Sequence, residues 1–334
     1  MKEIRQPYLL FLGDAPDRLA AKTAIGVYDW RPGACVGQFR LPGCAPDLGI
    51  EDLGIAEAAN RGALTLMVGV VNRGGVVPDN WLEPMLAALE AGMDIASGLH
   101  TRLGSIPALA DAATRLGREL IDARIPRDSY PIATGAPRPG HRLLTVGTDC
   151  SVGKMYTSLA IEAEMKARGW KADFRATGQT GIFIAGGGVP VDAVVSDFIS
   201  GSVEQLCPAN DPEHWDIVEG QGSLFHPSFA GVSLGLLHGA QPDCLVLCHE
   251  PTRTHMRGLP HQPLPGIQEC IETNLKAARL VSDNPRFVGI SVNSFHVEPG
   301  ERENLLSRLE DEFGMPCVDP MVTGVAALVD NIEV

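Results

Sequence analysis

Short apolar runs alternate with amphipathic stretches along the first 125 residues. The runs YLLFLG, TLMVGVV and MDIAS indicate buried strands, and DNWLEPMLAALEAG and SIPALADAATRLG indicate helices. Asp79 lies near the start of the first of these helices and Gly92 just past its end; Ser105 is the expected N-cap of the second and Gly117 its stop. Strands that alternate with helices predict a parallel sheet.

Residues 141–334 repeat this alternation with the runs RLLTV, KADFR, WDIVE, CLVLC and FVGISV. The first helical stretch, KMYTSLAIEAEMKARG, ends with Lys166, Arg168 and Gly169, as dipole and capping preferences favour. Between the two halves, residues 126–140 are rich in proline and glycine, which break helices and strands alike. We therefore expect an α/β protein with two domains, 1–125 and 141–334, joined by a linker.

Polar residues follow the strands of the second half. Ligands of open α/β sheets bind beyond the carboxyl ends of the strands. Solvent exposure of loops would explain polar residues after one or two strands. Polar residues after five strands instead predict one shared site. The residues concerned are Gly147, Thr148 and Asp149; Arg175, Thr177, Gln179 and Thr180; Glu219, Gln221, Ser223 and His226; His249, Glu250, Arg253 and His255; and Asn293 and Ser294.

The segment VGTDCSVGKMYTS is typical of a phosphate-binding loop in all but one position. Consecutive backbone N–H groups before a helix favour an anion, and Lys154 adds a positive charge. Met155 replaces the hydroxyl that normally binds Mg²⁺, and a thioether is a poor ligand for that hard cation. The loop therefore predicts a cofactor whose phosphate is held but does not react, such as coenzyme A, with no metal required. Its expected cofactor-binding residues are Gly147, Thr148, Asp149, Cys150, Ser151, Val152, Gly153, Lys154 and Met155.

The net charge of the chain restricts the kinds of partner that it can bind. The chain has 41 acidic and 27 basic residues, a net charge of −14, so a whole-protein basic footprint for nucleic acid is absent. The apolar runs are too short for a signal peptide or a membrane span. The eight cysteines show no C-x-x-C pair or zinc spacing, which favours reduced thiols. We expect a cytoplasmic homo-oligomer that acts on a small molecule, with no nucleic-acid or membrane partner.

The loop also resembles those of dethiobiotin synthetase and related P-loop enzymes. VEGQGS resembles the segment of that superfamily whose carboxylate handles Mg²⁺, and GISVN resembles its late strand, whose Asn lies near the base. At whole-chain level the sequence resembles the DgcN-type D-glutamate N-acetyltransferase family. The segments that carry this resemblance are AKTAIGVYDW, CVGQFRLPGC, DIASGLHTRL, LLTVGTDCSVGK, DFRATGQTGI, IAGGGVP, VEGQGSLFHP, LGLLHGAQPD, LCHEPTRTH and PCVDP. The resemblance implies a Rossmann-like domain before a P-loop NTPase-like domain, acetyl-CoA as donor and an acidic D-amino acid as acceptor.

Acetyl transfer to an amine needs a base, donors for the oxyanion and cations for the substrate carboxylates. The candidate bases are Glu219, His226 and His249, and the base is expected to be among them. Cys150 at a helix N-terminus would have a lowered pKa, although the phosphate would crowd an acetyl-cysteine intermediate. The candidate substrate-binding residues are Arg175, Gln179, Arg253 and, from the first domain, Lys22.

Two other functions stay open from the sequence. One is an ATP-dependent P-loop enzyme, either a kinase or a ligase of the dethiobiotin-synthetase type, which Glu219 favours and Met155 opposes. The other is a non-catalytic nucleotide-sensing module, which the many ionisable residues at the strand ends oppose. An NAD site at the Gly13 turn has no support, because GDAPDR departs from G-x-G-x-x-G.

Overall fold

The computed structural model describes residues 3–71, 73–126 and 129–332. The described chain forms two compact units, in which Gly178–Ala193 joins the N-terminal half. Unit 1 contains the first 128 residues and this segment; unit 2 contains Ser129–Thr177 and Val194–Val334. Residues 1 and 2 of the N-terminal run, 127 and 128 of the expected linker, and 333 and 334 of the expected second domain lie outside the described residues.

The Gly178–Ala193 segment is fastened to unit 1 by backbone and side-chain hydrogen bonds. Its helix α6 (Gln179–Ala185) packs against α1 (Lys22–Trp30). The Tyr8 hydroxyl donates to Phe183 O at 2.9 Å, and Ile4 N–H donates to Gly186 O at 2.6 Å. The sequence analysis expected residues 141–334 to form one continuous domain and did not predict that Gly178–Ala193 belongs to unit 1.

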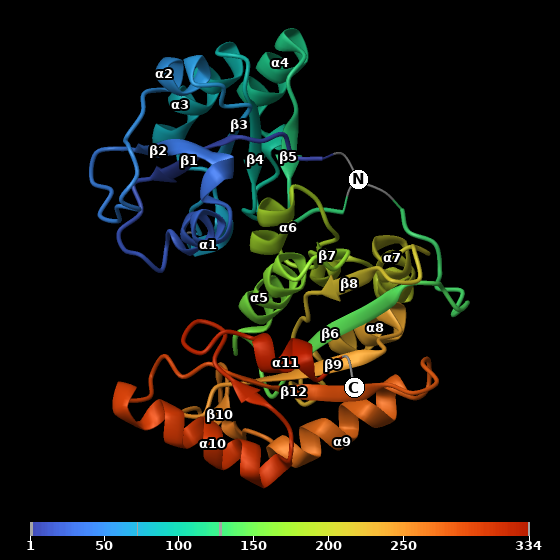
Figure 1. The fold of residues 1–334 in the computed structure, drawn as a ribbon. Helices are drawn as coiled ribbons and strands as arrows, with labels where there is room; N and C mark the ends of the chain where they lie inside the picture. The colour runs from blue at the N-terminus through green and yellow to red at the C-terminus, as the bar shows by residue number, and fades with distance from the viewer. Residues whose placement is uncertain (1–2, 72, 127–128, 333–334) are drawn as a thin grey trace. The chain divides into compact units, whose positions relative to one another are not determined.

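Unit 1 is a five-stranded parallel sheet in the order β2-β1-β3-β4-β5. Helices α2, α3 and α4 cover one face, and α1 and α6 cover the other (Figure 1). Every residue of β1, β3 and β4 is buried, as strands covered on both faces require. The strands are β1 (Tyr8–Gly13), β2 (Cys35–Arg40), β3 (Thr65–Val68), β4 (Asp94–Ser97) and β5 (Leu120–Asp122); the remaining helices are α2 (Ile55–Asn60), α3 (Asp79–Glu90) and α4 (Pro107–Leu116).

The helix limits in unit 1 agree with the sequence signals except at one N-terminus. Helix α3 begins at Asp79, and Gly92 follows its end with a φ of 89°. Gly117 ends α4 in the left-handed conformation. The prediction of Ser105 as the N-cap of α4 is wrong: Ile106 occupies that position, and the Ser105 hydroxyl donates to Arg102 O instead.

Unit 2 is a six-stranded parallel sheet in the order β13-β12-β9-β6-β8-β7. Helices α5 and α11 cover one face, while α8, α9 and α10 cover the other (Figure 1). The strands are β6 (His141–Gly147), β7 (Ala172–Arg175), β8 (Trp215–Val218), β9 (Cys244–His249), β12 (Arg286–Val292) and β13 (Cys317–Val318), with an antiparallel hairpin of β10 (His255–Met256) and β11 (Leu259–Pro263). The helices are α5 (Lys154–Ala167), α7 (Ile199–Leu206), α8 (Ala230–Ala240), α9 (Ile267–Ala278), α10 (Arg302–Phe313) and α11 (Ala326–Asp330); short 3₁₀ helices are Pro32–Ala34, Arg73–Gly75, Leu103–Ser105, Val191–Ala193, Ser196–Phe198 and Pro299–Glu301.

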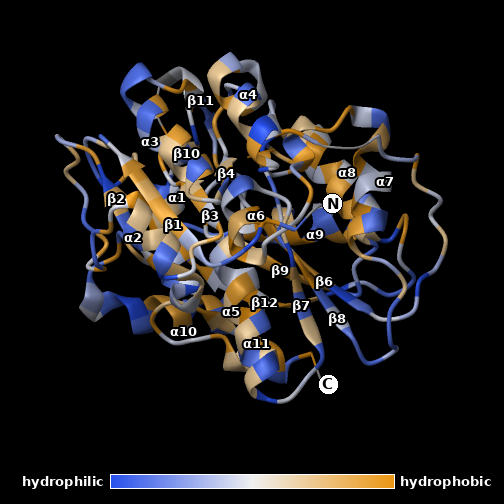
Figure 2. Cartoon of the chain, turned by 90° about the horizontal axis from the view of Figure 1, so that it is seen from above, coloured by the Kyte–Doolittle hydropathy of each residue, from blue (hydrophilic) through white to orange (hydrophobic). Residues whose placement is uncertain are grey.

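The hydrophobic core of unit 2 holds the carboxyl ends of its strands in fixed positions. Leu247 of β9 and Ile290 and Val292 of β12 pack against Cys270 of α9 and Leu306 of α10. Figure 2 shows β9 and β12 in the colours of apolar residues. Burial of a large apolar side chain stabilises the fold by about 1.5–3 kcal/mol, so this packing gives the loops that follow β6, β9 and β12 a rigid base.

The prediction of a two-domain α/β protein with parallel sheets is confirmed. All eight cysteines are free thiols, as expected. No helix in the described part of the chain combines the length and apolar character needed to span a bilayer.

Candidate functional site

The loop between β6 and α5 has the backbone of an anion-binding site. Gly153 caps the helix with a φ of 107°, which favours glycine, and Ser151 adopts a φ of 54°. A Cβ at Gly147 would lie 2.9 Å from the Lys154 Nζ, so this glycine leaves room for the ammonium group. We call residues 147–154 the anion loop.

Lys154 is buried beneath this loop. Its side chain is 7% exposed, and its Nζ donates to Asp149 O at 2.8 Å. Burial lowers the pKa of Lys154, because desolvation disfavours the charged form. An ammonium group has three protons, so Lys154 can still donate to an anion that enters the loop.

Met155 is the second residue of α5, where a metal-binding loop carries a hydroxyl. The other metal candidate among the described residues is the group of Asp149, Cys150 and His226, whose ligand atoms lie within 4.8 Å of one another. The carboxylate of that group already accepts hydrogen bonds from Arg253 and from the Arg257 backbone. Protein donors therefore occupy the oxygens that a cation would need.

Asp149 is fully buried, and its carboxylate is held by three donors. Its Oδ2 accepts from Arg253 Nη1 at 2.7 Å and from the Arg257 N–H at 2.7 Å, and its Oδ1 accepts from the Cys150 N–H at 2.6 Å. Arg253 also donates to Cys150 O at 2.7 Å and to Glu250 Oε2 at 3.1 Å. Asp149 and Arg253 thus fix the outer side of the anion loop.

The expectation of a lowered pKa for Cys150 is wrong. Burial raises the pKa of this thiol, and the nearby positive charge of Lys154 only partly opposes that effect. A thiol that stays protonated is a poor nucleophile. The structure thus disfavours an acetyl-cysteine intermediate.

Glu219 follows β8 directly and is buried beside the anion loop. Its Oε2 accepts from the Thr177 N–H at 2.9 Å, and its backbone oxygen accepts from the Thr177 hydroxyl at 2.6 Å. A Cβ at Gly220 would lie 1.7 Å from Thr145 O and 3.0 Å from Lys154 Cδ. Glycine at 220 therefore allows the segment after β8 to approach the loop.

His226 is buried with both ring nitrogens engaged. The Ser228 N–H donates to Nδ1 at 3.2 Å, which makes Nδ1 the acceptor. The proton then lies on Nε2, which donates to Arg257 O at 3.3 Å. The ring also stacks on Phe229 at a centroid distance of 4.5 Å. This environment is that of a structural histidine.

His249 ends β9 beside the first residues of the anion loop. Its Nδ1 lies 3.2 Å from the Thr148 hydroxyl. Burial lowers the pKa of His249 from 6.5 to about 4, so the ring is neutral at pH 7. No protein group in the described residues bonds to its Nε2. We call Thr148, Asp149, 219–229 and 249–263 the polar flank of the loop.

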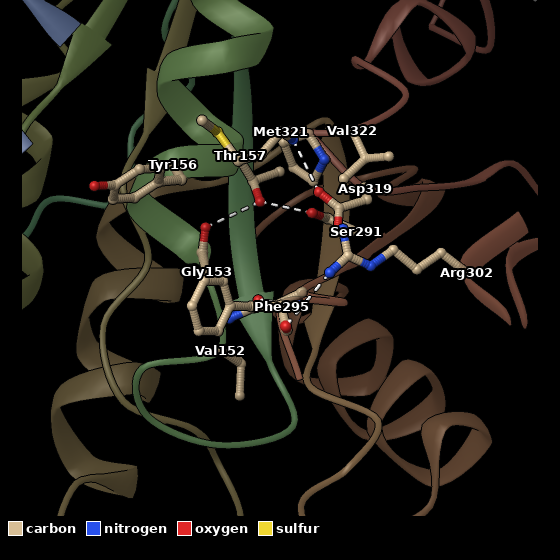
Figure 3. A pocket seen from close by; sticks show the side chains of 12 residues that line it. Val152, Gly153, Tyr156, Thr157, Ser291, Phe295, Arg302, Asp319, Met321 and Val322 are labelled. Carbon is tan, nitrogen blue, oxygen red and sulfur yellow. Dashed lines mark hydrogen bonds between the residues drawn. The ribbon is translucent and has the colours of Figure 1, made fainter. Parts of the chain in front are cut away.

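A cavity of about 460 Å³ opens on another side of the anion loop. Figure 3 shows Tyr156 and Thr157 of α5 on one side of it, and Ser291, Asp319 and Arg302 on the other. Three apolar side chains at this cavity are largely exposed: Phe295 at 76%, Met321 at 63% and Val322 at 54%. We call Tyr156, 291–295 and 319–322 the apolar flank.

Sequence reasoning singled out Asn293 and Ser294 but missed the rest of the apolar flank. Phe295 and the 319–322 turn lie outside any strand, and they meet only because β12 and β13 are neighbours. The one signal available was the polar pair Asn293-Ser294 at the end of β12.

Two of the predicted substrate-binding residues, Lys22 and Gln179, belong to unit 1, and a third, Arg175, is held in an ion pair of unit 2. Arg175 pairs with the buried Asp216, with Nε at 2.7 Å and Nη2 at 2.6 Å from Oδ1. Lys22 is exposed at the first position of α1 in unit 1. Gln179 also belongs to unit 1, where its side-chain amide lies against Gly98 and donates to Gly98 O at 2.8 Å when its nitrogen is oriented toward that carbonyl. Within unit 2, Arg253 is the predicted substrate-binding residue that contacts the anion loop.

A glycine-bounded anion loop with a buried lysine, at the carboxyl edge of a parallel sheet, defines unit 2 as a P-loop domain. Residues 131–329 match the family model described as the DUF1611_C P-loop domain of unknown function. Residues 40–126 match its partner, described as the DUF1611_N Rossmann-like domain of unknown function. The chain belongs to the DUF1611 family.

Two curated relatives cover almost the whole chain. A protein of Tritonibacter scottomollicae named D-glutamate N-acetyltransferase is 55% identical over 329 residues, 98% of this chain and 99% of that protein. A protein of a Pseudoalteromonas species with the same name is 50% identical over 330 residues, 99% of each chain. The crystal structure of a DUF1611 family protein from Anabaena variabilis is similar with a TM-score of 0.84 and 32% identity, over 98% of this chain and 99% of that one.

Proposed function

We propose that this chain is an enzyme that transfers an acetyl group from acetyl-CoA to the amine of D-glutamate. The name of the two relatives at 55% and 50% identity supports this reaction. The structural observation that carries it is the anion loop, which keeps a buried lysine, has Met155 in place of a metal-binding hydroxyl and borders an apolar cavity. Such a loop suits a donor whose phosphates are held and do not react.

In this proposal the pyrophosphate of the donor lies on the anion loop. The backbone N–H groups before α5 and the remaining protons of Lys154 would bind its oxygens. A bound anion would also favour the charged form of Lys154 and so oppose the effect of burial on its pKa. The adenosine end would enter the cavity of the apolar flank, where Phe295 offers an exposed ring for stacking.

The amine nitrogen of the acceptor attacks the thioester carbon; the C–N bond forms and the C–S bond breaks. The ammonium must lose a proton before attack, and the departing thiolate can take one up. We propose His249 as the base, because its ring is neutral at pH 7 and its Nε2 is not committed within the described chain. The anionic groups of bound substrates would raise the pKa of His249 towards neutrality, where a base is most effective.

Glu219 and His226 are retained as alternative bases. Both nitrogens of His226 are engaged, so His226 would have to exchange a protein partner for the substrate, and the carboxylate of Glu219 accepts the Thr177 backbone N–H. Arg253 is the predicted carboxylate-binding residue that lies beside the loop. Lys22, Arg175 and Gln179 stay predictions.

We also propose that the reaction needs no metal, since Met155 and the engaged oxygens of Asp149 leave poor ligands. The rival reading is an ATP-dependent P-loop enzyme, which requires Mg²⁺ on the phosphates. Glu219 after β8 is the feature that favours it.

Thermal unfolding with acetyl-CoA, CoA, ATP, and ATP plus Mg²⁺ separates the two readings. A ligand at 100 times its Kd stabilises the folded state by about 2.7 kcal/mol. We expect acetyl-CoA and CoA to raise the Tm, and we expect thiol release from acetyl-CoA to depend on D-glutamate, to be weaker with L-glutamate and to persist in EDTA. Stabilisation by ATP only with Mg²⁺, or thiol release indifferent to D-glutamate, would reject the proposal.

A further inference from the structure

The hairpin of β10 and β11 is attached directly to the anion loop. Residues 250–263 leave β9 and turn back at Gly258, which has a φ of 79°. Met256, which precedes the turn and pairs with Leu259, is buried, while Arg257 in the turn is exposed. Every polar group that fastens the hairpin to the loop comes from Arg253 or Arg257.

Asp149 is the acceptor that holds both of these residues. Its Oδ2 receives the Arg253 guanidinium and the Arg257 backbone N–H, each at 2.7 Å. Arg253 then caps two loop carbonyls, Cys150 O at 2.7 Å and Ser151 O at 3.4 Å. A buried carboxylate with this set of donors is a strong, directional tether.

The charge of Arg253 is neutralised by two carboxylates. Asp149 and Glu250 both pair with it, at 2.7 Å and 3.1 Å. Arg257 differs: its guanidinium contacts only the Ser151 hydroxyl in the described structure, and its backbone is fixed at both ends by Asp149 and by His226 Nε2. The backbone is thus held while the cationic side chain reaches the outer edge of the anion loop without a carboxylate partner.

We infer that Arg257 is a second phosphate-binding cation of the anion loop, beside Lys154, and that Asp149 is a positioning residue that holds the hairpin bearing it. This inference rests on the proposed function for the identity of the donor. Arginine binds phosphate oxygens through two parallel N–H groups, which suits the pyrophosphate of coenzyme A. Against a net charge of −14, an added local cation also favours capture of an anionic donor.

The first test compares Arg257→Ala and Arg257→Lys with Arg308→Ala, which removes an exposed arginine of α10. We expect Arg257→Ala to raise the KM for acetyl-CoA roughly 10-fold or more, the usual consequence of losing a charged hydrogen bond. The kcat and the KM for D-glutamate should change less than about twofold, because the phosphate does not react. Arg257→Lys should retain part of the affinity, and Arg308→Ala should behave as the native enzyme.

Binding of inorganic pyrophosphate, measured by titration calorimetry, tests the same residue without the reaction. We expect native protein to bind it and Arg257→Ala to bind it roughly 10-fold more weakly. If D-glutamate is acetylated but Arg257→Ala keeps the native donor KM and pyrophosphate Kd, the inference is wrong and the proposed function stands. If no acetylation occurs but pyrophosphate binding depends on Arg257, the function is wrong and the cation is correctly assigned.

Trypsin reports on the positioning role of Asp149, since it cleaves after Arg257. Asp149→Asn should speed cleavage at Arg257–Gly258 and raise the donor KM, while acetyl-CoA or pyrophosphate should slow cleavage of the native protein. Cleavage that is unchanged by Asp149→Asn and by both ligands would show that the hairpin is not held by this carboxylate. A higher KM for D-glutamate alone in Arg257→Ala would assign the arginine to the acceptor and also overturn the inference.

Discussion

The two flanks of the anion loop differ in how fully their side chains are committed. On the polar flank, Asp149 is paired with Arg253 and both nitrogens of His226 are bonded. On the apolar flank, Phe295 and Met321 border a cavity of about 460 Å³ and are largely exposed. The polar flank is thus largely preorganised by hydrogen bonds within the protein. The apolar flank offers exposed surface that a ligand can cover.

This difference suggests a division of labour within one site. Preorganised polar groups are useful where charge develops during a reaction, because they need no rearrangement at that moment. Exposed apolar groups beside a cavity instead favour binding of a flat, apolar portion of a ligand. Changes at the candidate bases of the polar flank should therefore alter turnover. Changes on the apolar flank should alter donor affinity, as should changes at Asp149 and Arg257, the donor-binding part of the polar flank.

The largest effect is expected from His249→Gln. Loss of a general base lowers kcat roughly 10²- to 10⁴-fold, while the donor Kd should change little. In the native enzyme the acidic limb of the kcat/KM profile should lie near pH 4, the pKa of His249 in the free protein, and it should vanish in the variant. Steady-state kinetics from pH 3.5 to about 8 would measure both.

Glu219→Gln and His226→Gln are the comparison variants for this assignment. A collapse of kcat in one of them, with His249→Gln active, would move the base to that residue. Near-native kcat in all three would place the chemistry outside the polar flank, and Lys22, the candidate from unit 1, would be the next residue to test.

His249 should also make stability depend on pH. Between pH 6.5 and about 4 the unfolded chain binds a proton at this residue and the native protein does not, so acidification favours unfolding. The contribution lost is on the order of 3 kcal/mol, at about 1.4 kcal/mol per pKa unit. Urea unfolding at pH 7 and pH 4.5 should show a smaller loss in His249→Gln than in native protein or in His261→Gln, an exposed control. Equal losses in all three would refute the burial effect.

Lys154 lies beneath the loop between the flanks, and its removal should affect binding before turnover. Lys154→Ala takes away one charged hydrogen bond to a phosphate, so the donor KM should rise roughly 10- to 100-fold with kcat little changed. Kinetics at saturating D-glutamate would show this split. An unchanged donor KM with a collapsed kcat would instead make Lys154 part of the chemistry.

The sequence predicted the regular part of this structure better than the site. The runs that became β1, β6 and β9 are buried and strongly apolar, so their periodicity identifies them. The anion loop was predictable because local geometry requires its glycines. Gly153 has a positive φ, and a side chain at Gly147 would collide with Lys154.

The features that could not be predicted from the sequence depend on which helices and strands become neighbours in the fold. The Arg175–Asp216 pair arises because β7 and β8 are adjacent in the sheet, and the Asp149–Arg253 pair involves a hairpin too short for a periodic signal. The raised pKa of Cys150 follows from burial, which overrides the local effect of a helix N-terminus. Tertiary contacts, rather than local pattern, decided each of these.

The smallest effect is expected on the apolar flank, from Phe295→Ala. Stacking of a base on an aromatic ring is worth about 1–3 kcal/mol, and an exposed ring such as Phe295 should fall near the lower limit. The donor KM should therefore rise about fivefold, with kcat and the KM for D-glutamate unchanged. Leu280→Ala, which removes an apolar side chain that is 75% exposed elsewhere in unit 2, is the matched control. Competition by adenosine 3′,5′-bisphosphate should weaken in Phe295→Ala and stay native in the control. A variant with lower kcat but native donor KM and native competition would show that the two flanks do not divide binding from chemistry.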